Sequence, residues 1–206
     1  EVERILGMVD GAVLLVDAAE GAMPQTKFVV MKALALGLKP IVVINKIDRP
    51  DARPDEVINE VFDLFAALDA NDDQLDFPIL YASGRNGWTA ETLDGPRENM
   101  ESLFDLIVKH VPAPSVAGKT AEPFTLLATI LEANPYLGRV LTGRIASGKI
   151  KLNMPAKALS RDGSVIEESR ITKLLAFRGL KRVPVEEAEA GDIVSVAGFT
   201  TASVAD

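Results

Sequence analysis

Two polar turns follow apolar runs of this sequence, and their residue types could bind a purine base. Asn45–Asp48 (NKID) comes directly after Ile41–Ile44, and Ser83–Arg85 (SGR) comes directly after Pro78–Ala82. An ionised carboxylate only accepts hydrogen bonds. Guanine presents two neighbouring donors, N1–H and the N2 amine, so Asp48 could accept from both, whereas adenine offers an acceptor at N1. A site built to bond such donors can reject analogues lacking them by about 10⁴–10⁵-fold.

The remaining residues of the two turns could supply further contacts to the base. Asn45 can tie its turn to the neighbouring turn, and the stem of Lys46 can lie over the flat ring. The Ser83 hydroxyl can orient the Asp48 carboxylate, the amide that follows Ser83 can donate to guanine O6, and the next side chain can stack on the base. The bland alternative is a pair of polar turns at strand ends. The candidate base-binding residues are Asn45, Lys46, Asp48, Ser83, Gly84 and Arg85.

The segments around these turns alternate between apolar runs and helical patterns over residues 1–114. Short continuous apolar runs are typical of strands buried on both faces, here Ala12–Val16, Ile41–Ile44 and Pro78–Ala82. Helical patterns cover residues 1–10, 24–36, 54–68 and the surroundings of 103–108. This alternation predicts an α/β domain whose parallel sheet binds ligands at the carboxyl ends of its strands. With three recognisable strands, we expect an uncovered sheet edge and exposed apolar helix faces, so that the chain self-associates, rearranges or is only marginally stable.

The second part of the chain changes to an all-β pattern. Residues 111–123 (VPAPSVAGKTAEP) contain three prolines and little apolar content, and residues 115–122 within them are predicted to be a linker. Residues 123–206 contain short apolar runs between Gly and Asn turns, which predicts a small β-barrel. The expected strand runs are FTLLATIL, RVLTGRI, KALS, VIEESRITKLLAF and DIVSVAG.

Composition excludes several classes of function. The 206 residues are 48% apolar and 25% charged, as in ordinary globular proteins. There is no cysteine and one histidine, His110, so thiol chemistry, histidine metal clusters and a Ser-His-Asp triad have no basis. No apolar run reaches the ~18 residues of a membrane span and no signal peptide is visible, so we expect a cytoplasmic protein without a membrane partner.

The net charge of −8 is unevenly distributed along the chain. Residues 1–114 carry 10 basic and 20 acidic side chains, whereas residues 115–206 carry 12 and 10. The balances of −10 and +2 indicate that the two parts face different partners, and the acidic part is unsuited to a nucleic acid backbone.

The two turns and their surroundings resemble a known family. NKID followed by a strand and SGR is similar to the base-recognition loops of P-loop GTPases. VERILGMVDGAVLLVDAAEGAMPQT and ALALGLKPIVVINKIDRP resemble the translational GTPases, and YASxxNGW followed by HVPAP resembles the BipA (TypA) ribosome-associated type. GRIASGKIK and EAGDIVSVAG are similar to the family's second domain. Elongation factor G and the tetracycline-resistance ribosomal protection proteins share AEGxxPQT and NKID, and they remain alternatives. Family members usually have Ala where this chain has Gly84.

The resemblance implies a parent protein that binds GTP or GDP with Mg²⁺ and hydrolyses GTP on the ribosome. The 206 residues contain no G-x-x-x-x-G-K-[ST] sequence, whose amides and Lys hold the phosphates. The family's D-x-x-G segment and its catalytic histidine are expected before Glu1, so we expect an excised fragment. No residue here matches a catalytic or metal-binding position. The chain alone should therefore bind nucleotide weakly, hold no cofactor tightly and show no GTP turnover.

Basic residues in the barrel are the remaining candidates for a partner. In the family this domain faces the ribosome, so they are candidates for contacts with ribosomal RNA, although basic residues on strands are usually solvated. A second class of function is a non-enzymatic binding module that works through the barrel. The candidate RNA-contact residues are Arg144, Lys149, Lys151, Arg178, Lys181 and Arg182.

Overall fold

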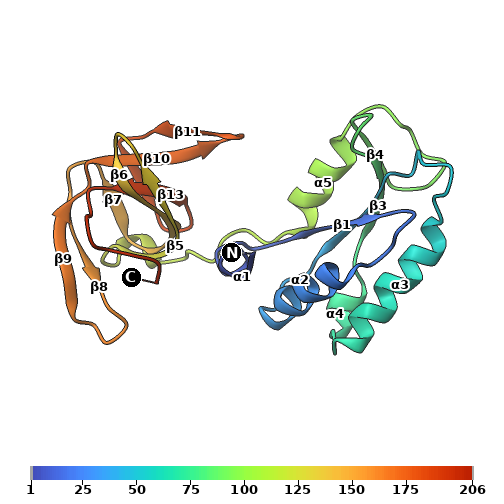
Figure 1. Ribbon diagram of the computed structural model, residues 1–206, viewed down its shortest axis with the longest axis horizontal. Coiled ribbons are helices and arrows are strands. Elements are labelled where there is room, and N and C mark those ends of the chain that lie inside the picture. The colour runs from blue at the N-terminus through green and yellow to red at the C-terminus, as the bar shows by residue number, and fades with distance from the viewer. Residues whose placement is uncertain (1, 206) are drawn as a thin grey trace. The chain divides into compact units, whose positions relative to one another are not determined.

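The computed structural model describes residues 2–205, and the chain forms two compact units. One unit consists of residues 9–113 with Val2, and the other of residues 114 onward together with residues 3–8. Figure 1 shows an α/β unit and a mostly β unit. The first helix, α1 (Val2–Leu6), groups largely with the β unit by its contacts. Its predicted start at Glu1 lies outside the described residues.

The α/β unit is built on a four-stranded sheet of order β1-β2-β3-β4. The predicted runs form β1 (Val13–Asp17), β2 (Ile41–Asn45) and β3 (Ile79–Ser83), which are mutually parallel. The prediction of three strands was incomplete, because β4 (Trp88–Ala90) pairs antiparallel with β3. A strand of three residues after a tight turn carries too little periodicity to be recognised in the sequence.

Helices cover both faces of this sheet (Figure 1). Helix α2 (Pro24–Ala35) and helix α3 (Pro54–Ala67) each begin with a proline, whose fixed φ suits the first helical turn. They pack with Val42 and Ile44 of β2, while α5 (Glu101–His110) packs on the opposite face. The alternation of β2 side chains between two buried faces explains why its sequence is continuously apolar. A short helix, α4 (Asp72–Leu75), was not predicted.

One end of the sheet is left uncovered, as we expected from the strand count. β1 is the terminal strand of the sheet among the described residues. Val13 and Leu15 point to the face that α5 covers further along, and Leu15 is 60% exposed. Phe28, Met31 and Leu36 are also exposed apolar side chains near or within α2. The described residues contain no helix long and apolar enough to cross a membrane.

The β unit contains a five-stranded antiparallel sheet of order β11-β10-β13-β6-β5 and two smaller strand pairs, β8–β9 and β7–β12. Its core is apolar and includes Ile145, Ile150 and Leu174. The strands are β5 (Thr125–Asn134), β6 (Gly138–Ser147), β7 (Lys149–Lys151), β8 (Pro155–Leu159), β9 (Val165–Arg170), β10 (Lys173–Arg178), β11 (Lys181–Pro184), β12 (Glu187–Glu189) and β13 (Ile193–Ala197).

Two details of the β unit differ from the sequence pattern. The run VIEESRITKLLAF is divided into β9 and β10 at Ile171, which is buried in the core. Residues 115–122 contain a 3₁₀ turn, η1 (Lys119–Ala121), and the Lys119 carbonyl accepts the Gly148 amide at 2.8 Å. The predicted linker is therefore hydrogen-bonded to the β unit over part of its length.

Candidate nucleotide-binding site

The two predicted turns lie side by side at the carboxyl ends of β2 and β3. Because these strands are parallel neighbours, their last residues, Asn45 and Ser83, open adjacent loops. The Ile47 amide donates to the Ala82 carbonyl at 3.1 Å, and the Gly84 amide donates to Asn45 Oδ1 at 2.9 Å. Backbone and side-chain bonds thus join the NKID and SGR loops directly.

Asp48 is an exposed carboxylate at this junction. A hydrogen bond from Ser83 is the main cause that lowers the pKa of Asp48, and the positive charge of Arg85 lowers it further. The buried Ser83 hydroxyl accepts from Asn86 Nδ2 at 2.9 Å, so its own hydrogen is available to Asp48. Asp48 is therefore ionised at neutral pH and can act as the double acceptor that guanine needs.

The Gly84 amide already has a hydrogen-bond partner in the structure. We predicted that this amide donates to guanine O6, but in the structure it donates to Asn45 Oδ1. An N–H group has one hydrogen, so a bond to O6 would have to be shared with Asn45 or replace that bond. Asn45 plays the tying role that its position suggested, and it does so by occupying this donor.

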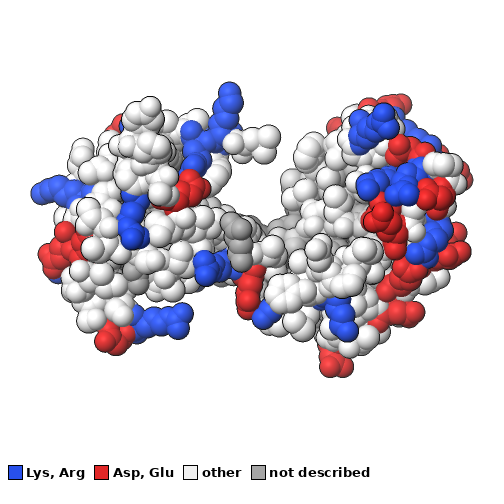
Figure 2. Space-filling model, viewed as in Figure 1, with Lys and Arg blue, Asp and Glu red and all other residues white. Residues whose placement is uncertain are grey.

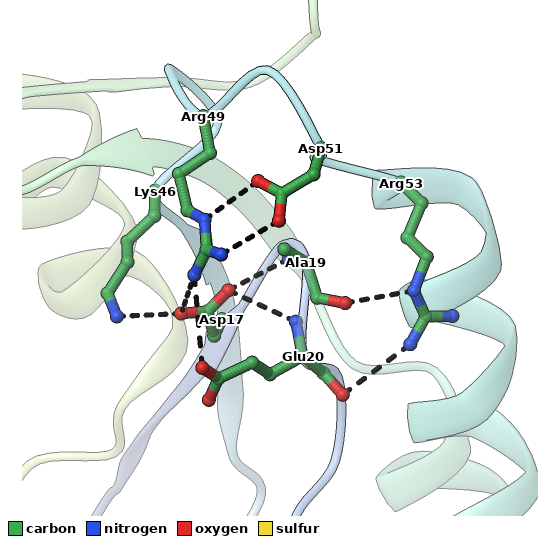
Figure 3. Close-up of polar contacts among 7 residues, drawn as sticks. All are labelled: Asp17, Ala19, Glu20, Lys46, Arg49, Asp51 and Arg53. Carbon is green, nitrogen blue, oxygen red and sulfur yellow. Dashed lines mark hydrogen bonds and ion pairs between the residues drawn. The ribbon is translucent and has the colours of Figure 1, made fainter.

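Lys46 has a left-handed backbone conformation with φ of 64°. This conformation is unusual for a residue with a side chain. Its ammonium lies 2.7 Å from Asp17 Oδ2, at the end of β1 (Figure 3). That partner raises the pKa of Lys46, so the lysine remains a cation.

Asp17 was not among the predicted site residues. It nevertheless contacts both the NKID loop and the loop that follows β1. One oxygen accepts the Ala19 and Glu20 amides at 2.8 and 3.2 Å, and the other lies against Lys46 and Arg49 (Figure 3). Burial acts to raise the pKa of Asp17, but these hydrogen bonds outweigh it and lower the pKa from 3.8 to about 2. A charged residue ending an apolar strand, beside NKID, was the signal in the sequence.

Two arginines after NKID extend these contacts. Arg49 makes a two-pronged contact with Asp51, with distances of 2.9 and 2.8 Å. Arg53 donates to the Ala19 carbonyl at 2.9 Å and pairs with Glu60. The loop after β1 is therefore bonded from two directions to the segment that leads from NKID into α3.

The candidate RNA-contact residues lie in the β unit, and several are paired with acidic side chains. Lys149 and Lys151 lie opposite Glu189 and Glu187 across the β7–β12 pair, at 3.0 and 3.4 Å. Arg182 contacts Glu132 at 2.8 Å. Figure 2 shows basic side chains over the end of the β10–β11 hairpin. The other three candidates are Arg144 on β6, Arg178 at the end of β10 and Lys181 at the start of β11.

Comparisons with known proteins define the class of this chain. Residues 1–113 match the family described as the elongation factor Tu GTP binding domain, and residues 138–206 match elongation factor Tu domain 2. The chain therefore belongs to the translational GTPase family, in which an α/β GTP-binding domain precedes a β-barrel. This confirms the fold class and the family expected from the sequence.

Similar curated proteins point to one type within this family. The chain is 51% identical to the large ribosomal subunit assembly factor BipA of Synechocystis, 50% identical to that of Bacillus subtilis and 48% identical to that of Escherichia coli K12. Each match covers the whole chain and 33–34% of the relative. The chain thus spans about a third of the length of these relatives, and the resemblance to the BipA type is confirmed.

Proposed function

We propose that this chain provides the guanine-recognition part of a GTPase that acts in ribosome assembly. The observation that carries the proposal is the junction of the two loops, where Asn45 Oδ1 accepts the Gly84 amide and the Ile47 amide donates to the Ala82 carbonyl, which brings Asp48 beside Ser83. The relatives' name, large ribosomal subunit assembly factor, supports the ribosome as the partner and the cytoplasm as the location.

Base selection in this proposal rests on Asp48. Its carboxylate accepts from N1–H and the N2 amine of guanine, and the Ser83 hydroxyl fixes the direction of the carboxylate. Lys46 covers one face of the ring and Arg85 the other. Asn45 orients the Gly84 amide, which can share its hydrogen with O6.

Phosphoryl transfer in this family requires groups that hold the phosphates and Mg²⁺. GTP supplies the phosphoryl group, and Mg²⁺ neutralises charge on its oxygens. No motif for either task lies within the 206 residues. This chain's residues are therefore assigned to binding and orienting the base, and hydrolysis is assigned to the full-length gene product.

Ribosomal RNA is the proposed partner of the basic end of the β10–β11 hairpin. Arg178 and Lys181 face each other across this hairpin, and Leu180 at its turn is fully exposed. Lys149 and Lys151 are weaker candidates, because acidic partners opposite them already balance their charge. Phosphate contacts need basic groups whose charge is available.

The replacement Asp48→Asn tests the proposed base recognition. In the full-length gene product we expect it to weaken GDP binding and favour xanthosine diphosphate, because xanthine presents an acceptor where guanine presents its amine. A loss of GDP affinity of about 100-fold or more is expected, corresponding to about 2.7 kcal/mol. Dissociation constants for both nucleotides, measured by titration calorimetry, check this.

Asp73→Asn is the matched control for this experiment. Asp73 pairs with Lys39 at 2.8 Å and is not part of either loop. The replacement Asp73→Asn should leave the dissociation constants of GDP and xanthosine diphosphate unchanged. Unaltered GDP affinity in Asp48→Asn would show that this carboxylate does not read the base.

A further inference from the structure

Asp17 holds the lysine of the proposed base site from a strand that the site does not otherwise use. It is the last residue of β1, and it is the register partner of Asn45 in the parallel β1–β2 pair. The Ala18 amide continues this pairing by donating to the Asn45 carbonyl at 2.8 Å. The Asp17 side chain therefore lies at the carboxyl edge of the sheet, directly beside Lys46. The distance between Asp17 Oδ2 and Lys46 Nζ is 2.7 Å.

We propose that Asp17 is a positioning residue for nucleotide binding, which fixes Lys46 in the conformation that covers the base. This inference rests on the proposed function of the NKID loop. Asp17 itself touches no nucleotide in this scheme and acts through the lysine.

Lys46 needs such a partner because both its backbone and its side chain are costly to order. A φ of 64° is disfavoured for a residue with a Cβ atom. A free lysine side chain loses rotamer entropy when it is fixed. If Asp17 fixes the lysine when the protein folds, this loss is not incurred when the nucleotide binds.

Asp17 is more buried than Lys46 and makes more hydrogen bonds with its surroundings. The Asp17 side chain is 11% exposed, whereas that of Lys46 is 53% exposed. Bonds from the Ala19 and Glu20 amides fix the second carboxylate oxygen of Asp17 (Figure 3). Arg53 secures the same loop by donating to the Ala19 carbonyl. Asp17 therefore determines the position of the lysine, and not the reverse.

In this proposal Asp17 affects how tightly the nucleotide binds, and Asp48 determines which base is chosen. The stem of Lys46 can cover the flat face of any purine, so its position affects guanine and xanthine equally. Asp48 distinguishes the two bases by hydrogen bonding at N1 and N2. Loss of Asp17 should therefore lower affinity without changing the choice of base.

The replacement Asp17→Asn tests this role in the full-length gene product. Asparagine keeps an oxygen that can accept the Ala19 and Glu20 amides, and it removes the charge that binds Lys46. We expect GDP to bind about tenfold more weakly, equivalent to about 1.4 kcal/mol. When Asp17→Asn is combined with Asp48→Asn, the affinity for xanthosine diphosphate should fall by the same factor relative to Asp48→Asn alone. Asp73→Asn again serves as the control with unchanged affinity.

A double-mutant cycle with Lys46→Met shows whether Asp17 acts through the lysine. In the Lys46→Met background, Asp17→Asn should cause no further loss of GDP affinity, because the group it positions is gone. Unchanged GDP affinity in Asp17→Asn would overturn the inference, as would an equal loss with and without Lys46. The Asp48→Asn variant tests the proposed base site separately from the role of Asp17. If this variant does not come to prefer xanthine over guanine, the proposed base site itself is wrong.

Discussion

Asn45 shows how one residue can decide the geometry of a binding loop. It ends β2, and its side-chain oxygen takes the Gly84 amide from the next loop at 2.9 Å. The hydrogen bond keeps the SGR loop beside Asp48, although the amide was expected to serve the base. In the proposed base site, a contact between the Gly84 amide and the base would require Asn45 and the ligand to share its one hydrogen.

The replacement Gly84→Ala is expected to be tolerated. A Cβ at this position would lie 3.5 Å from Asn45 Oδ1, an ordinary contact, and the backbone of Gly84 is not left-handed. We expect GDP affinity within about twofold of the original, and stability unchanged or raised by up to about 1 kcal/mol. Thermal denaturation and nucleotide titration of the full-length gene product measure both effects.

Gly21→Ala is the contrasting control for this prediction. Gly21 has a φ of 76°, and a Cβ there would collide with the Glu60 side chain. This variant should be clearly less stable than the original. A strong loss of GDP affinity in Gly84→Ala would instead indicate that the amide cannot tolerate a side chain.

At the scale of whole elements, Glu167 joins β9 to the segment that follows β13. Its carboxylate accepts from the Thr200 and Thr201 amides at 2.8 Å each, and from both threonine hydroxyls. The Ala202 amide adds a longer bond of 3.2 Å. These bonds, with that of the Thr201 amide foremost, lower the pKa of Glu167 from 4.5 to about 2. The Glu167 carboxylate thus ties the β8–β9 hairpin to residues 200–202.

The replacement Glu167→Gln should destabilise the chain in a pH-dependent way. Because the pKa is depressed in the folded state, the stabilisation is complete above the unfolded value of 4.5 and is lost as pH falls towards 2. We expect a loss on the order of 1–3 kcal/mol at neutral pH, since a neutral amide accepts these bonds less well and leaves donors unpaired. The difference in unfolding free energy should shrink below pH 4.5, as denaturant titrations across pH would show.

Glu168→Gln is the neighbouring control on the same strand. Glu168 forms an exposed pair with Lys157 at 2.7 Å, and such pairs contribute only about 0–1 kcal/mol. If the free energy of unfolding of Glu167→Gln is no lower than that of Glu168→Gln, the Glu167 hydrogen bonds do not stabilise the fold as proposed.

At the scale of the whole molecule, the uncovered end of the α/β sheet has consequences for association. β1 ends the sheet, and Leu15 on it is 60% exposed beside the half-exposed Val13. Exposed strand edges and apolar faces favour pairing between copies. We propose that the 206-residue chain self-associates through this strand.

The replacement Leu15→Lys should reduce this association in the 206-residue chain. The lysine places a charge on the exposed face of β1, and a charge on an edge strand disfavours pairing. Sedimentation velocity at increasing protein concentration should show a shift towards monomer relative to the original chain. Val108→Lys, at an exposed apolar residue of α5, is the control without effect. Monomeric behaviour of the original chain at all concentrations would contradict the prediction.

The sequence by itself determined the class of each domain and the position of the two loops. Continuous apolar runs and helical periodicity depend on neighbours within a few residues, so β1, β2, β3, α2, α3 and α5 were recognisable. The elements α4 and β4 were not, because four or three residues are too few to show a period. Placing NKID and SGR at strand ends followed from the same local pattern.

Only the tertiary structure decided which polar groups meet across the sheet. The bond between the Gly84 amide and Asn45, and that between Lys46 and Asp17, join residues 39 and 29 positions apart in the numbering. Such partners depend on strand order and register, which bring β1, β2 and β3 together at one edge. A hydrogen-bond donor takes the nearest acceptor in space, and that acceptor cannot be identified from distance along the chain.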